Sequence, residues 1–242
     1  MMDRRDALLD LRDEVCEANK ELAERGLARF TFGNASAIDR ESGVVVIKPS
    51  GVPYDAMTPA QMVVVNMNGD VVEGSLRPSS DLATHLELYR AFDQIGGVVH
   101  THSHYATVWA QSRREIPCLG TTHADYFHGA IPLTEHLSAD DIQSEYEANT
   151  GREIVRRFTG LDPRRMPAVL VAGHASFCWG ESVAAAVETA DLLEEVARMA
   201  YATLTLNSDA DAIPAALLDK HFLRKHGPAA YYGQGGDSDH RR

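Results

Sequence analysis

The stretch GGVVHTHSHYATVWA, residues 96–110, places three histidines on alternate positions directly after an apolar run. Alternate side chains of an extended strand leave the same face, so we expect His100 and His102 to lie side by side. The turn at Ser103, which can cap the next helix, would direct His104 away from them. Two neighbouring imidazoles suit a metal ion, but two ligands alone do not define a site. Ordinary polar residues at the end of a strand would show the same pattern.

A third histidine follows a second apolar run. His174 ends AVLVAGH, residues 168–174, a pattern typical of a buried strand. If both strands end in one pocket, three imidazoles with a carboxylate or an open position suit zinc in a catalytic role. Cys178, four residues later, could supply a softer ligand, although its position is more typical of a thiol in the core.

Composition excludes several classes of function. The chain has 242 residues, of which 44% are hydrophobic, which is enough for a single large domain. Its formal net charge of −12 argues against a nucleic-acid or anionic-membrane partner. The start, MMDRRDALLDLRDEVCEANK, mixes acidic and apolar residues, unlike a signal or transit peptide. Three cysteines without a C-x-x-C pair indicate free thiols in a reducing compartment, so we expect a cytoplasmic protein.

Hydrophobic periodicity predicts strands mixed with flanking helices, which is typical of one layered α/β domain. We expect helices over residues 8–22, 79–92, 105–111 and 182–204, hairpins over 35–51 and 62–74, and strands over 98–102 and 168–174. Gly26 would end the first helix, and Ser79 or Ser80 would cap the second. Residues 235–242 are expected to form a disordered tail.

Three short polar stretches predict a cradle for an anion. They are FGNAS with Gly33 and Asn34, KPSG with Lys48, Ser50 and Gly51, and PSSD with Ser79, Ser80 and Asp81. Glycine lets backbone amides approach a ligand, and the start of a helix offers unpaired N–H groups. Lys48 adds the positive charge that the acidic chain lacks. Each stretch alone is typical of an ordinary turn or cap, but their combination with the histidines is more specific.

Seven motifs resemble, in order, those of the class II aldolase/adducin family, and most closely its L-ribulose-5-phosphate 4-epimerases. They are TFGNAS, IKPSGVPYD, RPSSDLATHLELYRAF, GGVVHTHSHYATVWAQ, LGTTHADYFHGAIPLTE, AVLVAGHASFCWG and HFLRKHGPAAYYGQ. The resemblance extends to Gln234 and implies one catalytic domain over residues 1–234. It implies a three-layer α/β/α fold with a central, largely antiparallel sheet. It also implies a homotetramer with active sites at the subunit contacts.

The resemblance further implies a set of site residues. It makes His100, His102 and His174 ligands of zinc or another divalent metal ion, with Asp81 next to the ion. The residues that would hold the substrate, chiefly its phosphate, are Gly33, Asn34, Ser50, Gly51, Ser79 and Ser80, with Lys48 beside them. His104 falls where the family varies and receives no role. GHASFCWG differs from the more usual HGPF form of its loop but keeps the ligand.

Proton transfer is implied for residues nearer the C-terminus. Asp125 of THADYF and Tyr232 of YYGQ would be the proton-transfer pair, and His221 would support Tyr232. The resemblance implies that Asp125 and zinc come from one chain, and that Tyr232 and His221 come from the next. Without the resemblance, Asp125 would be interpreted as a helix cap and Tyr232 as a surface aromatic residue.

The implied activity interconverts L-ribulose 5-phosphate and D-xylulose 5-phosphate. The ketone at C2 leaves the hydrogen on C4 non-acidic, so simple deprotonation cannot invert that carbon. Cleavage of the C3–C4 bond, rotation of the aldehyde fragment and re-addition would invert it. Because the C4 oxygen loses a proton on one face and gains one on the other, two acid–base groups are needed.

Two other functions remain open. A sugar-phosphate aldolase of the same family, such as L-fuculose-1-phosphate aldolase, would release the two fragments, but those aldolases carry Glu at the position of Asp81. An adducin-like scaffold would keep the fold without chemistry. The three histidines and both proposed proton carriers argue against the scaffold.

Overall fold

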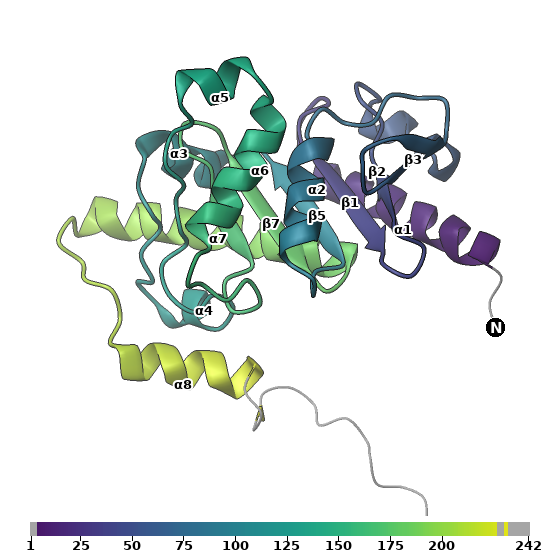
Figure 1. The fold of residues 1–242 in the computed structure, drawn as a ribbon. Coiled ribbons are helices and arrows are strands. Elements are labelled where there is room, and N and C mark those ends of the chain that lie inside the picture. Colours follow the sequence, from purple (N-terminus) through teal and green to yellow (C-terminus); the bar gives the residue numbers. More distant parts are fainter. Residues whose placement is uncertain (1–3, 227–229, 232–242) are drawn as a thin grey trace, which may run out of the picture.

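The computed structural model describes residues 4–226 and 230–231, and within them seven strands form a single antiparallel sheet (Figure 1). The sheet order is β4-β3-β2-β1-β5-β7-β6. The strands are β1 (Asn34–Asp39), β2 (Val44–Ile47), β3 (Val63–Asn66), β4 (Val71–Glu73), β5 (Gly97–Thr101), β6 (Ala168–Leu170) and β7 (Ser176–Gly180). Tyr232 and residues 235–242, for which a catalytic role and a tail are predicted, lie outside the described residues.

Helices cover both faces of this sheet. They are α1 (Arg4–Glu24), α2 (Leu82–Ala91), α3 (His104–Ser112), α4 (Thr121–Ala124), α5 (Ala139–Gln143), α6 (Tyr146–Arg157), α7 (Val183–Leu206) and α8 (Ala215–His226), with short 3-10 turns η1 (Tyr54–Ala56) and η2 (Pro59–Gln61). In Figure 1, α1 and α7 lie behind the sheet, whereas α2 and α6 lie in front of it. The predicted three-layer α/β/α fold with an antiparallel sheet is therefore confirmed.

A close approach between β5 and α7 fixes the strand that carries the first histidine. A Cβ added at Gly97 would lie 2.4 Å from Cα of Val183 and 2.6 Å from the carbonyl oxygen of Ser182. Because these are backbone atoms, only glycine lets the start of α7 pack directly on β5. Gly97 therefore lets α7 pack directly against the strand that carries His100.

Several element boundaries differ from the prediction. The strand expected over residues 168–174 ends at Leu170, and the sequence pattern does not predict β7, α6 or α8. The helix expected over residues 79–92 begins at Leu82, and neither serine caps it. The backbone N–H of Ser79 instead donates to the carbonyl oxygen of Lys48, in a neighbouring loop, at 2.9 Å.

The expected cap at Ser103 is also wrong. Ser103 occupies the N-cap position of α3, but its buried hydroxyl makes no hydrogen bond among the described residues. The carboxylate of Glu194, from α7, accepts the N–H groups of Tyr105 and Ala106 at 2.8 and 3.0 Å. A negative side chain at this position satisfies two N–H groups that the first turn leaves unpaired.

Replacing Glu194 with alanine should therefore lower the free energy of unfolding by about 1 kcal/mol, the typical cost of a lost cap. The matched control is Glu195→Ala, because Glu195 is partly exposed and pairs only with Arg198 among the described residues. Urea denaturation of both variants measures the difference. Equal stabilities would show that Glu194 contributes no cap.

No helix in the described part of the chain is long and apolar enough to cross a membrane.

Candidate active site

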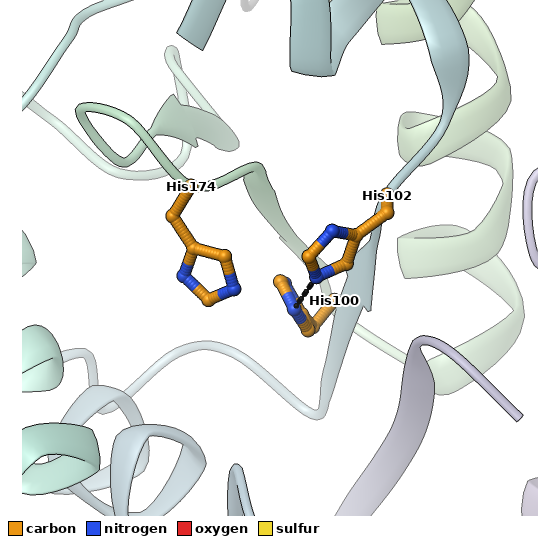
Figure 2. A group of neighbouring side chains, drawn as sticks. All are labelled: His100, His102 and His174. Carbon is orange, nitrogen blue, oxygen red and sulfur yellow. Dashed lines mark hydrogen bonds between the residues drawn. The ribbon is translucent and has the colours of Figure 1, made fainter. Parts of the chain in front are cut away.

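Three histidines from two segments of the chain converge at the end of β5 (Figure 2). His100 belongs to β5, His102 follows it directly, and His174 lies in the turn between β6 and β7. Each pair of ring centroids is 4.9 Å apart, and Nε2 of His100 lies 3.1 Å from Nε2 of His102. One nitrogen from each ring lies within 4.8 Å of the other two, so the three could hold one metal ion. The three histidines therefore meet as predicted, although His174 lies in a turn and not at the end of a strand.

The groups around these rings favour the neutral imidazole form that binds a metal ion. Nδ1 of His100 lies 2.8 Å from the carbonyl oxygen of Ser176, so it carries the proton and leaves Nε2 for a metal. Burial, together with neighbouring His100 and His102, lowers the pKa of His174 to about 4. Burial and the neighbouring His100 also lower the pKa of His102. Neutral imidazoles are the form that binds a metal, so this donor set fits a divalent ion.

The second ring nitrogen of His174 lacks the hydrogen bond that usually orients a metal-binding histidine. Nδ1 of His174 is buried and has no hydrogen-bond partner among the described residues. Metal-bound histidines normally donate this second N–H to an oxygen. The loop GHASFCWG, whose sequence departs from the family pattern, therefore holds its ligand by packing and by the left-handed turn at Gly173.

Asp81 lies close to the histidines but outside their ligand group. Its Oδ2 accepts a hydrogen bond of 2.6 Å from Nδ2 of Asn34. Burial acts to raise the pKa of Asp81, but His100, His85 and the bond from Asn34 outweigh it and hold the pKa below its usual value. Asp81 therefore lies next to the three histidines, where its short side chain is held by Asn34.

The three polar stretches of the predicted anion cradle lie together beside the histidines. Residues 48–51 and 77–80 run antiparallel, with an isolated bridge between Pro49 and Pro78. Asn34 lies opposite His100 in the β1–β5 pairing, and its Nδ2 also donates to Oγ of Ser79 at 3.0 Å. Oδ1 of Asn34 is buried without a partner among the described residues. The three predicted stretches therefore meet at one place.

The remaining cradle residues supply shape and charge. Gly33 has φ +80° and approaches so closely that an added Cβ would lie 2.7 Å from the carbonyl oxygen of His100. Lys48 is only 2% exposed, and its burial lowers its pKa, while the nearby Asp81 opposes that shift. Ser50, Gly51 and Ser80 are exposed and form the open side of the cradle.

Asp125 and His221 meet within one chain. Asp125 follows α4, and its Oδ1 accepts a hydrogen bond of 2.9 Å from Nδ1 of His221 on α8. The two helices lie next to each other in Figure 1, away from α5. A single chain therefore already brings Asp125 and His221 together, whereas the sequence analysis expects them from two different chains. The described residues that shift the pKa of Asp125 all belong to α8, and none is one of the three metal-site histidines.

Three residues of these sites were missed by sequence reasoning. The ring of Tyr146, the first residue of α6, lies 6.3 Å from that of His174, and the exposed ring of Phe32 lies 6.1 Å from that of His102. Phe32 lies within the quoted motif TFGNAS but receives no role there, and Tyr146 has no sequence signal that marks it. Arg224 binds Asp125, and its position three residues after His221 could have placed both on one helix face.

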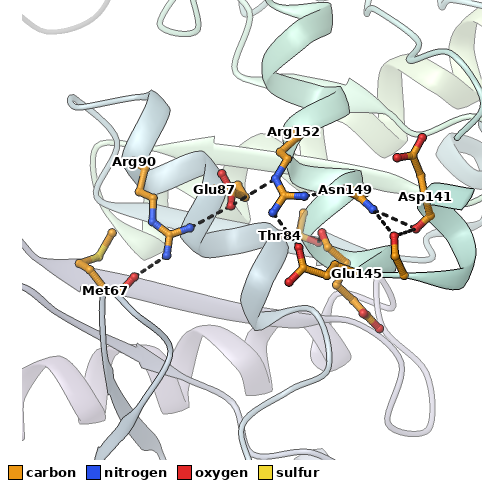
Figure 3. Close-up of polar contacts among 10 residues, drawn as sticks. Met67, Thr84, Glu87, Arg90, Asp141, Glu145, Asn149 and Arg152 are labelled. Carbon is orange, nitrogen blue, oxygen red and sulfur yellow. Dashed lines mark hydrogen bonds and ion pairs between the residues drawn. The ribbon is translucent and has the colours of Figure 1, made fainter.

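Tyr146 is held in place by contacts between α6 and α2. Oγ1 of Thr84 donates to the carbonyl oxygen of Glu147 at 2.6 Å. Arg152 lies 3.9 Å from Glu87 of α2 and donates to Glu145 at 3.0 Å (Figure 3). These contacts fix the first turn of α6 beside the histidines.

The family model described as the Class II Aldolase and Adducin N-terminal domain matches residues 13–201. The chain belongs to this family.

Solved structures support the assignment to the class II aldolase and adducin family. A structure named L-fuculose 1-phosphate aldolase is 27% identical, with a TM-score of 0.75, and the match covers 88% of this chain and 94% of that one. A putative aldolase/epimerase/decarboxylase, YgbL from Klebsiella pneumoniae, is 23% identical, with a TM-score of 0.69 and coverage of 88% and 98%. L-fuculose-1-phosphate aldolase from Thermus thermophilus is 22% identical, with a TM-score of 0.63 and coverage of 86% and 100%. The last two show the fold alone.

Two residues noted in the sequence lie outside the group of three histidines in this class II aldolase family member. Cys178 is fully buried in β7, and burial raises the pKa of its thiol, so it is a core residue. His104 is exposed at the start of α3 and packs against Tyr105 instead of joining the other histidines.

Proposed function

We propose that the protein is a zinc-dependent L-ribulose-5-phosphate 4-epimerase whose catalytic domain covers residues 1–234. The observation that carries the proposal is the convergence of His100, His102 and His174 next to the anion cradle of Asn34 and Lys48. Three neutral imidazoles are a typical ligand set for catalytic zinc, and other divalent ions can occupy similar sites. The buried free thiols accord with a cytoplasmic protein.

In this proposal the protein holds the phosphate of the aldehyde fragment while that fragment rotates. The phosphate would bind to the exposed Ser50, Gly51 and Ser80, with the buried Lys48 supplying positive charge. This anchor would retain the aldehyde fragment after the C3–C4 bond breaks, so the fragment could rotate without leaving. A bound divalent metal would supply Lewis-acid stabilisation for the negative charge that cleavage leaves on the other fragment.

Proton transfer would come from a neighbouring subunit. Asp125, directly after α4, binds His221 on α8, and none of the three converging histidines is among the groups that shift the pKa of Asp125. We infer a homotetramer in which this pair, with Tyr232, faces the metal site of the next subunit. In this arrangement Asp125 and His221 come from the same subunit, whereas the sequence analysis expects them from two different subunits.

A class II sugar-phosphate aldolase is the second candidate. The 27% identity to a structure named L-fuculose 1-phosphate aldolase supports it. Asp81 favours the epimerase, because the aldolases that the sequence resembles carry Glu there. The shorter side chain is held by Asn34 and stays outside the metal-ligand group.

A product assay separates the candidates. The protein, loaded with zinc, is incubated with L-ribulose 5-phosphate and separately with L-fuculose 1-phosphate, and the products are separated by chromatography. We expect D-xylulose 5-phosphate from the first substrate, because an anchored aldehyde re-adds before it escapes. Release of dihydroxyacetone and glycolaldehyde phosphate, or cleavage of the second substrate, would establish the aldolase instead. Turnover of neither substrate would refute both.

A further inference from the structure

The carboxylate of Asp125 is held by cationic side chains from a single helix. Arg224 donates to Oδ1 from Nε and Nη2 at 3.1 and 2.9 Å, and from Nη2 to Oδ2 at 2.8 Å. Nζ of Lys225 lies 3.9 Å from Oδ2. Nδ1 of His221 adds a third donor on Oδ1, at 2.9 Å. Both oxygens of Asp125 are therefore occupied by groups that favour the ionised carboxylate.

These contacts make Asp125 a poor proton carrier. An ionised carboxylate only accepts hydrogen bonds, and protonation would oppose the bidentate contact from Arg224. Although burial acts to raise the pKa of Asp125, Arg224, His221 and Lys225 lower it overall. Because these contacts hold Asp125 in its ionised form, Asp125 is poorly suited to exchange a proton.

His221 has the geometry that Asp125 lacks. Its Nδ1 faces the carboxylate, so the hydrogen bond fixes the proton on Nδ1 and leaves the lone pair of Nε2 available. Within residues 4–226 and 230–231, Nε2 of His221 has no hydrogen-bond partner. An acidic side chain that orients an imidazole in this way is a recurring arrangement for general acid–base catalysis.

We propose that His221 carries the proton through Nε2, and that Asp125 and Arg224 are positioning residues for its ring. The inference rests on the proposed function and changes the roles within it. On cleavage, Nε2 would take the proton of the C4 hydroxyl while the electrons of the C3–C4 bond move to C3. On re-addition, Tyr232 would return a proton to the C4 oxygen from the other face. Exchange with water would restore both groups.

Chemical rescue distinguishes a carrier from a positioning residue. His221→Gly should lower kcat by about a hundredfold or more, and added imidazole should restore about tenfold, because a diffusing imidazole can replace the missing base. Asp125→Gly should be comparably inactive, and formate should not restore it. The opposite pattern, in which formate rescues Asp125→Gly and imidazole leaves His221→Gly unchanged, would identify Asp125 as the carrier and overturn the proposal.

Arg224 provides a second test with a matched control. Arg224→Gln should lower kcat by about tenfold with little change in KM, and Arg224→Lys should recover part of the loss. The control is Arg156→Gln, because Arg156 pairs with Glu153 on the surface and should leave kcat unchanged. An Arg224→Gln protein as active as this control would contradict a positioning role.

A measurement without substrate separates this inference from the proposed function. A wild-type protein that converts no sugar phosphate would refute the proposed function. In that case, ¹⁵N NMR of histidine-labelled protein decides the inference, with the signal of His221 assigned by its loss in His221→Gln. A ring protonated at Nδ1 in the wild type, and changed in Asp125→Asn, supports it. A ring protonated at Nε2 overturns it.

Discussion

Replacing His102 with alanine should remove bound metal and activity together while leaving the fold intact. The ring of His102 lies 4.9 Å from those of His100 and His174, so its loss leaves two ligands for the ion. Mutation of an outer partner of a metal site typically costs about 10–100-fold in affinity or activity, so loss of a ligand should cost more. Elemental analysis, circular dichroism and the product assay measure the three quantities.

His104→Ala is the matched control for this experiment. His104 is two residues away and exposed, and it does not belong to the ligand group. Its removal should leave metal content and turnover near those of the wild type. Full metal occupancy in the His102→Ala protein would contradict the proposed ligand set.

Replacing Gly97 with alanine should destabilise the whole domain. The new Cβ would lie 2.4 and 2.5 Å from Cα and N of Val183, so β5 and α7 would have to separate. Overpacking in a core typically costs about 1–3 kcal/mol, and a clash between backbone atoms cannot be relieved by a side-chain rotation. We therefore expect a loss of about 3 kcal/mol or more in the free energy of unfolding, measured by urea denaturation.

Gly120→Ala controls for the effect of adding a methyl group. Gly120 has φ −159°, and an added Cβ would meet nothing within 4 Å. Its free energy of unfolding should stay within about 0.5 kcal/mol of the wild type. If Gly97→Ala unfolds at the same urea concentration as this control, the close approach of β5 and α7 does not limit stability.

Local sequence patterns predict much of the fold. The hairpins of β1 with β2 and of β3 with β4, and the long helix α7, follow from apolar periodicity and turn residues close to them in the chain. The pattern does not predict β7 or α8. The short run SFCWG offers little periodicity, and α8 is mostly exposed, so its apolar pattern is weak.

The metal site shows what the sequence by itself determined. The pairing of His100 with His102 is local, because alternate residues of any strand share a face. The polar stretches around Asn34, Lys48 and Ser79 carry glycine, lysine and serine in patterns typical of anion binding. Their chemistry was therefore predictable before the structure was known.

Only the tertiary structure decided which of these groups meet. His174 reaches His100 because β7 pairs with β5, which brings the turn before β7 next to the end of β5. A local sequence pattern does not specify such a pairing. Asp125 binds His221 and Arg224, about a hundred residues later, because α8 packs beside α4. Contacts between distant residues depend on the register and packing of whole elements, whereas sequence periodicity reports only which face of each element is buried.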